Sequence, residues 1–125
     1  MVKNEVVSWA GIEFLATDSG SVVTRLERSA RGAAPEHVHL CNSWTVVLAT
    51  EEQRVRDVLT DAQAVNLVDG VPLARALSDA ARREVRTVRG PSLFEQAAVH
   101  LGKVGVRQYF LGSTPDVLTK IQRRL

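Results

Sequence analysis

The chain has 125 residues, of which 45% are apolar and 24% are charged, so we expect one domain with one hydrophobic core and not a disordered chain. A net charge of only +2, without a long basic tract, does not favour nucleic acid as a partner. Because Cys41 is the only cysteine, the composition excludes an intrachain disulfide and a cysteine-based zinc site within one chain, and a reducing cytoplasm suits it best.

The first half of the chain alternates between patterns typical of strands and of helices. In chain order it predicts a short hairpin that turns at Gly11, a helix over 19–31, a strand over 37–41 and a helical stretch over 43–59 that is interrupted near Thr50. Asn42 stands just before the last of these, where an asparagine commonly caps a helix.

The second half continues this alternation. The run Ala64–Val68 is short, mostly apolar and stopped by Asp69-Gly70, which is typical of a buried parallel strand that enters a functional loop. The remaining expected elements are a helix that starts near Pro72, a strand over 85–88, a helix that starts near Ser92, a strand over 106–111 and a helix over 116–125. We therefore predict an α/β, Rossmann-like fold in which a mostly parallel sheet is flanked by helices and preceded by a β-hairpin.

Three of the predicted strands end in polar or glycine-bearing turns, at 40–43, 69–70 and 112–115. In open parallel sheets the ligand crevice lies beyond the carboxyl ends of the strands, where helix N-termini point their N–H groups. We expect all three turns to lie along the same edge of the sheet and to form this crevice together.

Asp69 and Asn42 each allow two interpretations. A carboxylate after a buried strand is held rigidly and could accept a proton from an attacking hydroxyl, but from the residues alone a cap for the helix that begins near Pro72 is the more common role of Asp69. The Asn42 amide could hold a sugar hydroxyl, although a helix cap is the more common role of asparagine at such a position.

Other polar groups carry weaker signals. The turn formed by Gly112, Ser113 and Thr114 is as consistent with a phosphate site as with a plain turn. His37 and His39 share one face of a strand and would need a third ligand to bind a metal, so we expect no metal site. Cys41 is interpreted as a core residue.

Five segments in order resemble the WecG/TagA/CpsF family, glycosyltransferase family 26, along almost the whole chain. They are Gly11-Ile12-Glu13-Phe14 ("G-v-x-F"), Leu40-Cys41-Asn42-Ser43 ("T-x-N-a"), the loop at Asp69-Gly70 ("p-D-G-x-x-x"), the stretch from Arg89 to Phe94 ("R-v-x-G-x-d-L") and Gly105–Pro115 ("g-x-x-v-f-l-l-G-g-x-p"). Five such pieces at compatible spacings are hard to obtain by chance.

The resemblance implies transfer of N-acetylmannosamine or a related hexose from a UDP-sugar to a polyprenyl-diphosphate-linked acceptor sugar, with inversion and without a required metal. It implies that Asp69 is the general base and that Asn42 and Gly70 belong to the substrate site, with the turn at Gly112, Ser113 and Thr114 on the nucleotide-sugar side. It further implies a cytoplasmic protein, peripheral at the inner face of the membrane, that serves surface polysaccharide or teichoic acid synthesis.

The chain departs from the family pattern at three points. Leu40 stands where the family usually has a threonine, and Thr87 stands where it usually has an arginine, so that Arg86 or Arg89 would have to bind the substrate instead. The family also continues for another half beyond the position of Leu125, so we expect a completing partner chain or self-association. The alternative hypothesis is a non-catalytic α/β binding or interaction module that keeps this fold.

Overall fold

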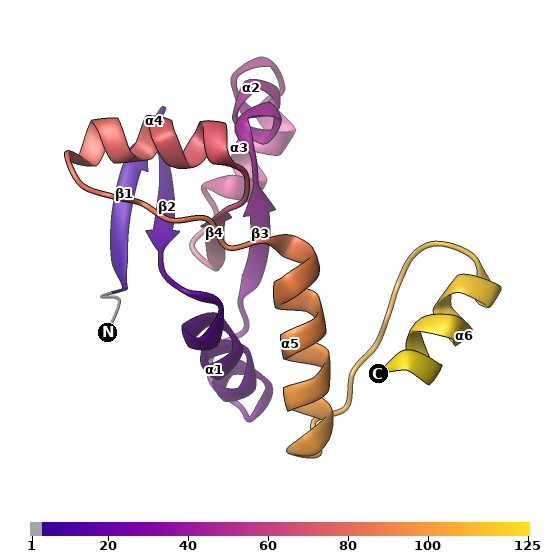
Figure 1. Ribbon diagram of the computed structural model, residues 1–125. Coiled ribbons are helices and arrows are strands. Elements are labelled where there is room, and N and C mark those ends of the chain that lie inside the picture. The colour runs from indigo at the N-terminus through magenta and orange to yellow at the C-terminus, as the bar shows by residue number, and fades with distance from the viewer. Residues whose placement is uncertain (1–3) are drawn as a thin grey trace.

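The computed structural model describes residues 4–125 as a four-stranded sheet with six flanking helices (Figure 1). The strands are β1 (Glu5–Trp9), β2 (Ile12–Ala16), β3 (His37–Cys41) and β4 (Ala64–Val68). The helices are α1 (Ser19–Ala30), α2 (Ser43–Glu51), α3 (Gln53–Leu59), α4 (Val71–Ala81), α5 (Gly90–Lys103) and α6 (Pro115–Arg124). The strand order is β1-β2-β4-β3, with β1 antiparallel to β2 and the other pairs parallel. The predicted α/β class, mostly parallel sheet and N-terminal hairpin are confirmed.

The hairpin forms because its two turn residues adopt the left-handed backbone that such tight turns need. Ala10 has φ 53° and Gly11 has φ 73°, which is the geometry that lets two twisted strands join through two residues. The turn sets the register in which Trp9 pairs with Ile12 and Val7 with Phe14. The result places Ile12 and Phe14, which are almost fully buried, on the same face of the sheet.

The two faces of the sheet bury two separate apolar clusters. Along β4, Val65 and Leu67 pack against α1 and α5, whereas Val68 packs toward α2, α3 and α4. This alternation follows from the period of two in a strand, and a strand covered on both faces needs an almost continuous apolar run. The position of β4 between β2 and β3 therefore explains its sequence, and it puts Asp69 at the centre of the sheet's carboxyl edge.

The predicted strand over 85–88 is wrong, because this segment is not paired as a strand. Val85 and Val88 are buried, one in each apolar cluster, and they anchor the segment by side-chain packing. A single backbone hydrogen bond from the Val88 N–H to the Val68 carbonyl, 2.7 Å long, ties the segment to β4. The short run between two valines predicted a strand, but burial of the two side chains accounts for their positions.

The predicted strand over 106–111 is also wrong. The Gln108 side chain donates to the Ala98 carbonyl, and the Phe110 ring lies 5.7 Å from that of Phe94, so the segment packs along α5. Within residues 4–125 the outer edge of β3 has no strand paired to it. Strand propensity cannot by itself supply a partner, and the contacts with α5 decide the path here.

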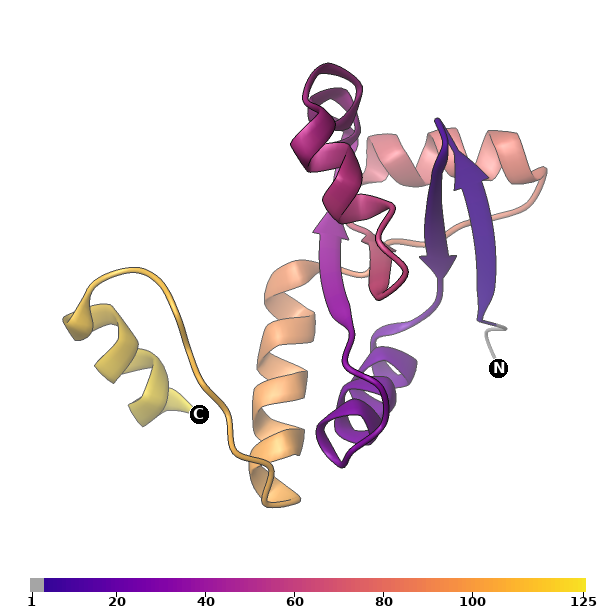
Figure 2. The same ribbon diagram turned by 180° about the vertical axis from the view of Figure 1, so that it is seen from behind.

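Helix α6 lies on the side of α5 that faces away from the sheet in both views (Figures 1 and 2). None of its residues is buried. No helix within residues 4–125 is long and apolar enough to cross a lipid bilayer.

Helices α1 and α5 lie side by side and are joined by a charged network (Figure 1). Glu27 accepts from the His100 Nε2 at 2.6 Å and from the Arg31 Nε at 2.9 Å. These hydrogen bonds, that of His100 first, hold the pKa of Glu27 below its usual value. The carboxylate is therefore stabilised in the folded state.

We expect the Glu27 network to make the fold sensitive to acid. Because folding lowers the pKa of Glu27 from about 4.5, its contribution is complete above that pH and is lost as the pH falls through the lower folded value. Glu27→Gln should therefore lose less stability than the wild type as the pH falls from 7 to below the usual pKa of the carboxyl group, because only the wild type has this carboxylate to protonate. Urea unfolding across this range measures the difference, and parallel curves for the two proteins would contradict the assignment.

Candidate functional site

The carboxyl ends of β3 and β4 lie side by side and bring two of the three predicted turns together. The Asp69 N–H donates to the Cys41 carbonyl at 2.7 Å, which extends the pairing of the strands by one residue. A Cβ added to Gly70 would lie 3.7 Å from the Cβ of Asn42. Asn42, Asp69 and Gly70 thus form one edge, as expected for the crevice of a parallel sheet.

Asp69 does not cap the helix that follows it, so the capping interpretation is wrong. The N-cap of α4 is Gly70, with φ 100°, and no side chain caps this helix. Pro72 in the first turn removes one of the N–H groups that a cap would satisfy. Within residues 4–125 the Asp69 carboxylate makes no hydrogen bond or ion pair, although it is partly buried. It is therefore available to a ligand.

The start of α5 faces this carboxylate. A Cβ added at Gly90 would lie 3.2 Å from the Asp69 Oδ2 and 3.1 Å from the Leu40 Cδ1, both closer than ordinary contact. A glycine at position 90 therefore lets the backbone of α5 approach the carboxylate closely. Asp69 lies between the ends of the central strands and the N-terminus of α5.

Asn42 is a helix cap, as the more common interpretation predicted. Its Oδ1 accepts from the Thr45 N–H at 3.0 Å and from the Thr45 hydroxyl at 3.1 Å, and its own N–H donates to the Thr45 Oγ1 at 3.2 Å. This capping box fixes the orientation of the amide. Its exposed NH₂ group remains as a donor for a sugar hydroxyl or another acceptor.

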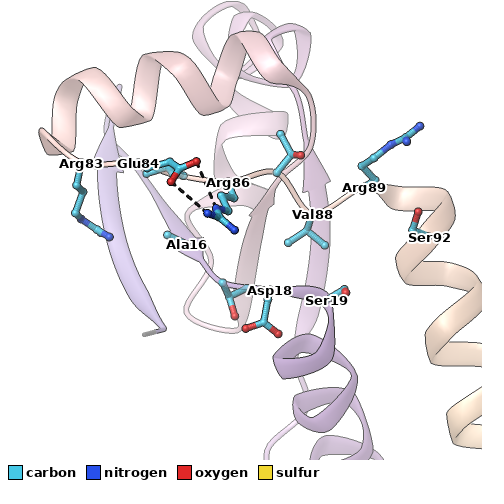
Figure 3. Close-up of a pocket in the computed structure, with 12 residues that line it drawn as sticks. Ala16, Asp18, Ser19, Arg83, Glu84, Arg86, Val88, Arg89 and Ser92 are labelled. Atoms are coloured by element: carbon cyan, nitrogen blue, oxygen red, sulfur yellow. Dashed lines mark hydrogen bonds and ion pairs between the residues drawn. The ribbon is translucent and has the colours of Figure 1, made fainter. Parts of the chain in front are cut away.

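A cavity of about 550 Å³ lies next to this edge, between the 83–89 segment and the N-terminus of α1 (Figure 3). Arg83, Arg86 and Arg89 line it. Arg83 pairs with Glu5 at 2.9 Å and Arg86 with Glu84 at 3.4 Å, the latter between exposed side chains whose attraction water screens.

The arginines differ in direction. Figure 3 shows Arg86 extending into the cavity, whereas Arg89 points away from it, beside the start of α5. Asp18, the acidic group at the opposite wall, caps α1 by accepting from the Ser21 N–H at 2.8 Å. The cavity is thus lined by arginines and by two acidic groups, Asp18 and Glu84. Its exposed and weakly paired cation is Arg86, which could meet an anionic group there.

The third predicted turn is not at this edge. Because the 106–111 segment passes along α5 outside the sheet, the turn at Gly112, Ser113 and Thr114 lies at the N-terminus of α6, away from β3 and β4 (Figure 1). Thr114 caps α6 by accepting from the Val117 N–H at 3.4 Å. The expected convergence of all three turns is wrong for this structure.

A buried polar network that the sequence did not single out is centred on Asn66 in β4 and reaches β2, β3 and α3. Asn66 is 2% exposed, and its NH₂ group donates to the Glu13 carbonyl at 2.9 Å and the Leu59 carbonyl at 2.8 Å. Its Oδ1, 2.9 Å from the His39 Nδ1, then accepts a hydrogen bond from the N–H of that ring nitrogen. The available signal was an asparagine inside an otherwise apolar strand.

The remaining sequence candidates do not add to the site. Burial raises the pKa of the Cys41 thiol to about 11, so the side chain is a core residue and not a thiolate nucleophile. The rings of His37 and His39 are 6.4 Å apart, and no third histidine, cysteine or acidic group within residues 4–125 completes a metal-binding set with them.

This geometry defines an α/β protein with a candidate ligand crevice at the carboxyl edge of its parallel strands, where a carboxylate stands beside an arginine-lined cavity. The family model of the WecG/TagA/CpsF glycosyl transferases matches residues 7–125, and the chain belongs to this family. No curated protein and no solved structure gives a significant match. Family membership supports a role in glycosyl transfer for cell-surface polysaccharide synthesis, with a sugar nucleotide and an acceptor as substrates.

Proposed function

We propose that the chain carries the acceptor side of a transferase that moves N-acetylmannosamine or a related hexose from a UDP-sugar to a polyprenyl-diphosphate-linked acceptor sugar. The observation that carries this proposal is the Asp69 carboxylate, which stands at the end of the central strand and is not used as a cap or in an ion pair within residues 4–125. Teichoic acid linkage units or related surface polysaccharides are the products that fit this reaction.

Asp69 acts as the general base in this proposal. It takes the proton from the acceptor hydroxyl as that oxygen bonds to the anomeric carbon of the donor sugar. The bond from this carbon to the diphosphate breaks at the same time, its electron pair leaves with UDP, and the configuration inverts. No metal is needed if cationic side chains balance the charge on the leaving diphosphate.

The other site residues position the substrates. Asn42 donates its amide N–H to a hydroxyl of the sugar, since its Oδ1 is occupied by the cap, and Gly70 leaves room beside it. Arg86 and Arg89 bind phosphate, Arg86 from the cavity wall and Arg89 from the start of α5. Gly112, Ser113 and Thr114 act on the nucleotide-sugar side, in an assembly where this turn comes closer to the crevice than it does here.

The first test is an NMR titration of the 125-residue chain with UDP and UDP-N-acetylhexosamines. Saturable shifts of the amides around Asn42 and Asp69 support an assembled crevice, and shifts at Gly112 in addition support the nucleotide role of that turn. A folded spectrum without shifts at any of these positions would contradict nucleotide-sugar binding by the chain.

Arg86→Gln is expected to weaken binding of the diphosphate substrate about tenfold, because it removes a charge-assisted hydrogen bond from an exposed side chain. The affinity should be measured at two salt concentrations, since the wild-type contact weakens with ionic strength. Arg54→Gln, an exposed arginine on α3 outside the cavity, is the matched control. Equal losses in the two variants would mean that Arg86 acts only through net charge.

One observation favours a second function, that of an interaction module. Tyr109 and Leu111 are 88% and 90% exposed, and the nearby outer edge of β3 is unpaired within residues 4–125. Exposed apolar side chains next to an open sheet edge are typical of surfaces that bind another chain. A homo-oligomer or a completing partner would cover them, with or without catalysis, and sedimentation over a range of concentrations distinguishes self-association from a monomer.

A further inference from the structure

An apolar groove lies between α5 and α6 and opens beside the candidate site. We call it the α5–α6 groove; its volume is about 450 Å³, and it is lined by Gly90, Pro91, Phe94, Glu95, Ile121, Arg124 and Leu125. A smaller apolar hollow of about 210 Å³ adjoins it, since both share Gly90 and Phe94. Cavities of a few hundred Å³ are the size of small-ligand sites.

Gly90 connects this groove to the edge of the sheet that carries Asp69. The residue lines the groove, and its backbone approaches so closely that an added Cβ would lie 3.2 Å from the Asp69 Oδ2. The same added Cβ would lie 3.1 Å from the Cδ1 of Leu40, which lines the smaller hollow. A molecule in the groove would therefore have one end next to Asp69.

Large apolar side chains line the groove and the adjoining hollow while remaining exposed. Phe94 and Leu125 of the groove are 45% and 41% exposed, and Leu40 of the smaller hollow is 41% exposed. Single exposed apolar residues are common on proteins, but several of them along two adjoining hollows indicate a surface that another apolar group covers.

Charge is distributed along the same line in a definite order. Arg89 lines the neighbouring cavity and makes no ion pair within residues 4–125, and it is the residue directly before Gly90. Gly90 itself lines the apolar groove. This order complements an amphiphile whose anionic head meets the arginines and whose apolar tail lies in the groove.

We propose that the α5–α6 groove binds the first part of the prenyl chain of the lipid-linked acceptor, with its diphosphate at Arg89 and its sugar at Asp69. The proposal rests on the proposed function, because that function supplies the amphiphilic substrate. A second protein chain fits the observations less well, since the occupant has to place a polar group beside a carboxylate as well as an apolar one in the groove.

Binding of farnesyl diphosphate and of inorganic diphosphate to the 125-residue chain tests this proposal. The two probes share the head and differ in the apolar chain, whose burial should make farnesyl diphosphate bind at least about tenfold more tightly. Ile121→Glu places a charge in the groove on a helix that has no buried residue, so folding should persist while this preference is lost. Val117→Glu, one turn earlier on α6 and outside the lining of the groove, should keep the preference.

Three other outcomes would overturn the proposal, and they differ in what they say of the proposed function. If the two probes bind with equal affinity while the Asp69 amide signal still shifts in the NMR titration and UDP-sugars still bind, only the prenyl-binding role of the groove is refuted. Absence of binding by farnesyl diphosphate, inorganic diphosphate and UDP-sugars together would refute both proposals. Dimerisation that Ile121→Glu abolishes, without any preference for farnesyl diphosphate, would assign the groove to a second copy of the chain.

Discussion

Asp69→Asn is expected to reduce hexose transfer at least about 100-fold, because loss of a general base typically costs two to four orders of magnitude in rate. The fold should be almost unaffected. The carboxylate caps no helix and makes no hydrogen bond or ion pair within residues 4–125, so its replacement by an isosteric amide should change the free energy of unfolding by no more than ~0.5 kcal/mol. Transfer is measured with the UDP-sugar and acceptor, and stability is measured by urea unfolding.

Asp79→Asn is the matched control, since Asp79 is exposed on the following helix, α4, and lies outside the site. It should keep full activity. Turnover by the Asp69→Asn variant at the rate of this control would remove Asp69 as the base. A large loss of stability in Asp69→Asn would instead show that the Asp69 carboxylate has a structural partner.

Asn66→Leu is expected to give the largest loss of stability among polar substitutions in the core. The change keeps the approximate volume but leaves the Glu13 and Leu59 carbonyls without their donor and the His39 ring without its acceptor. An unsatisfied buried polar group costs about 1–3 kcal/mol, so losing the donor to two carbonyls should cost ~2–6 kcal/mol in free energy of unfolding.

Chemical denaturation monitored by tryptophan fluorescence measures this loss. Gln63→Leu is the control, because Gln63 is exposed and only its backbone takes part in the structure. Its carbonyl accepts from the His37 N–H at 2.9 Å, and its N–H donates to the Asp61 Oδ1 at 2.8 Å. A variant at position 66 as stable as this control would mean that the network is not maintained in solution.

The local patterns predicted most elements because each depends on neighbouring residues. Turn residues at Ala10-Gly11, caps at Asp18 and Asn42, and the proline after Gly70 set where elements begin or turn, and the observed bounds of α1, β3 and β4 follow them closely. The interruption expected near Thr50 is present as the break between α2 and α3, at Glu52. Such signals act within a few residues and can be read without the fold.

The two wrongly predicted strands show that local sequence patterns do not predict strand pairing. The segments 85–88 and 106–111 both have the residues of strands, yet one is held by burial of Val85 and Val88 and the other by contacts of Gln108 and Phe110 with α5. Pairing is a property of two segments, and the partner is chosen by the whole fold. Because the second segment runs along α5 and not in the sheet, the turn at Gly112 that follows it does not lie at the predicted edge.

For the candidate site, the sequence by itself determined that Asp69 would stand at the end of a buried strand and that Asn42 could cap a helix, because both follow from apolar runs and cap preferences. Tertiary structure decided that Gly70 and not Asp69 is the cap of α4, that Gly90 brings α5 against the carboxylate, and that the apolar groove opens there. The physical reason is distance along the chain: position 90 is separated from Asp69 by a whole helix, so only packing of the helices on the sheet could bring them into contact.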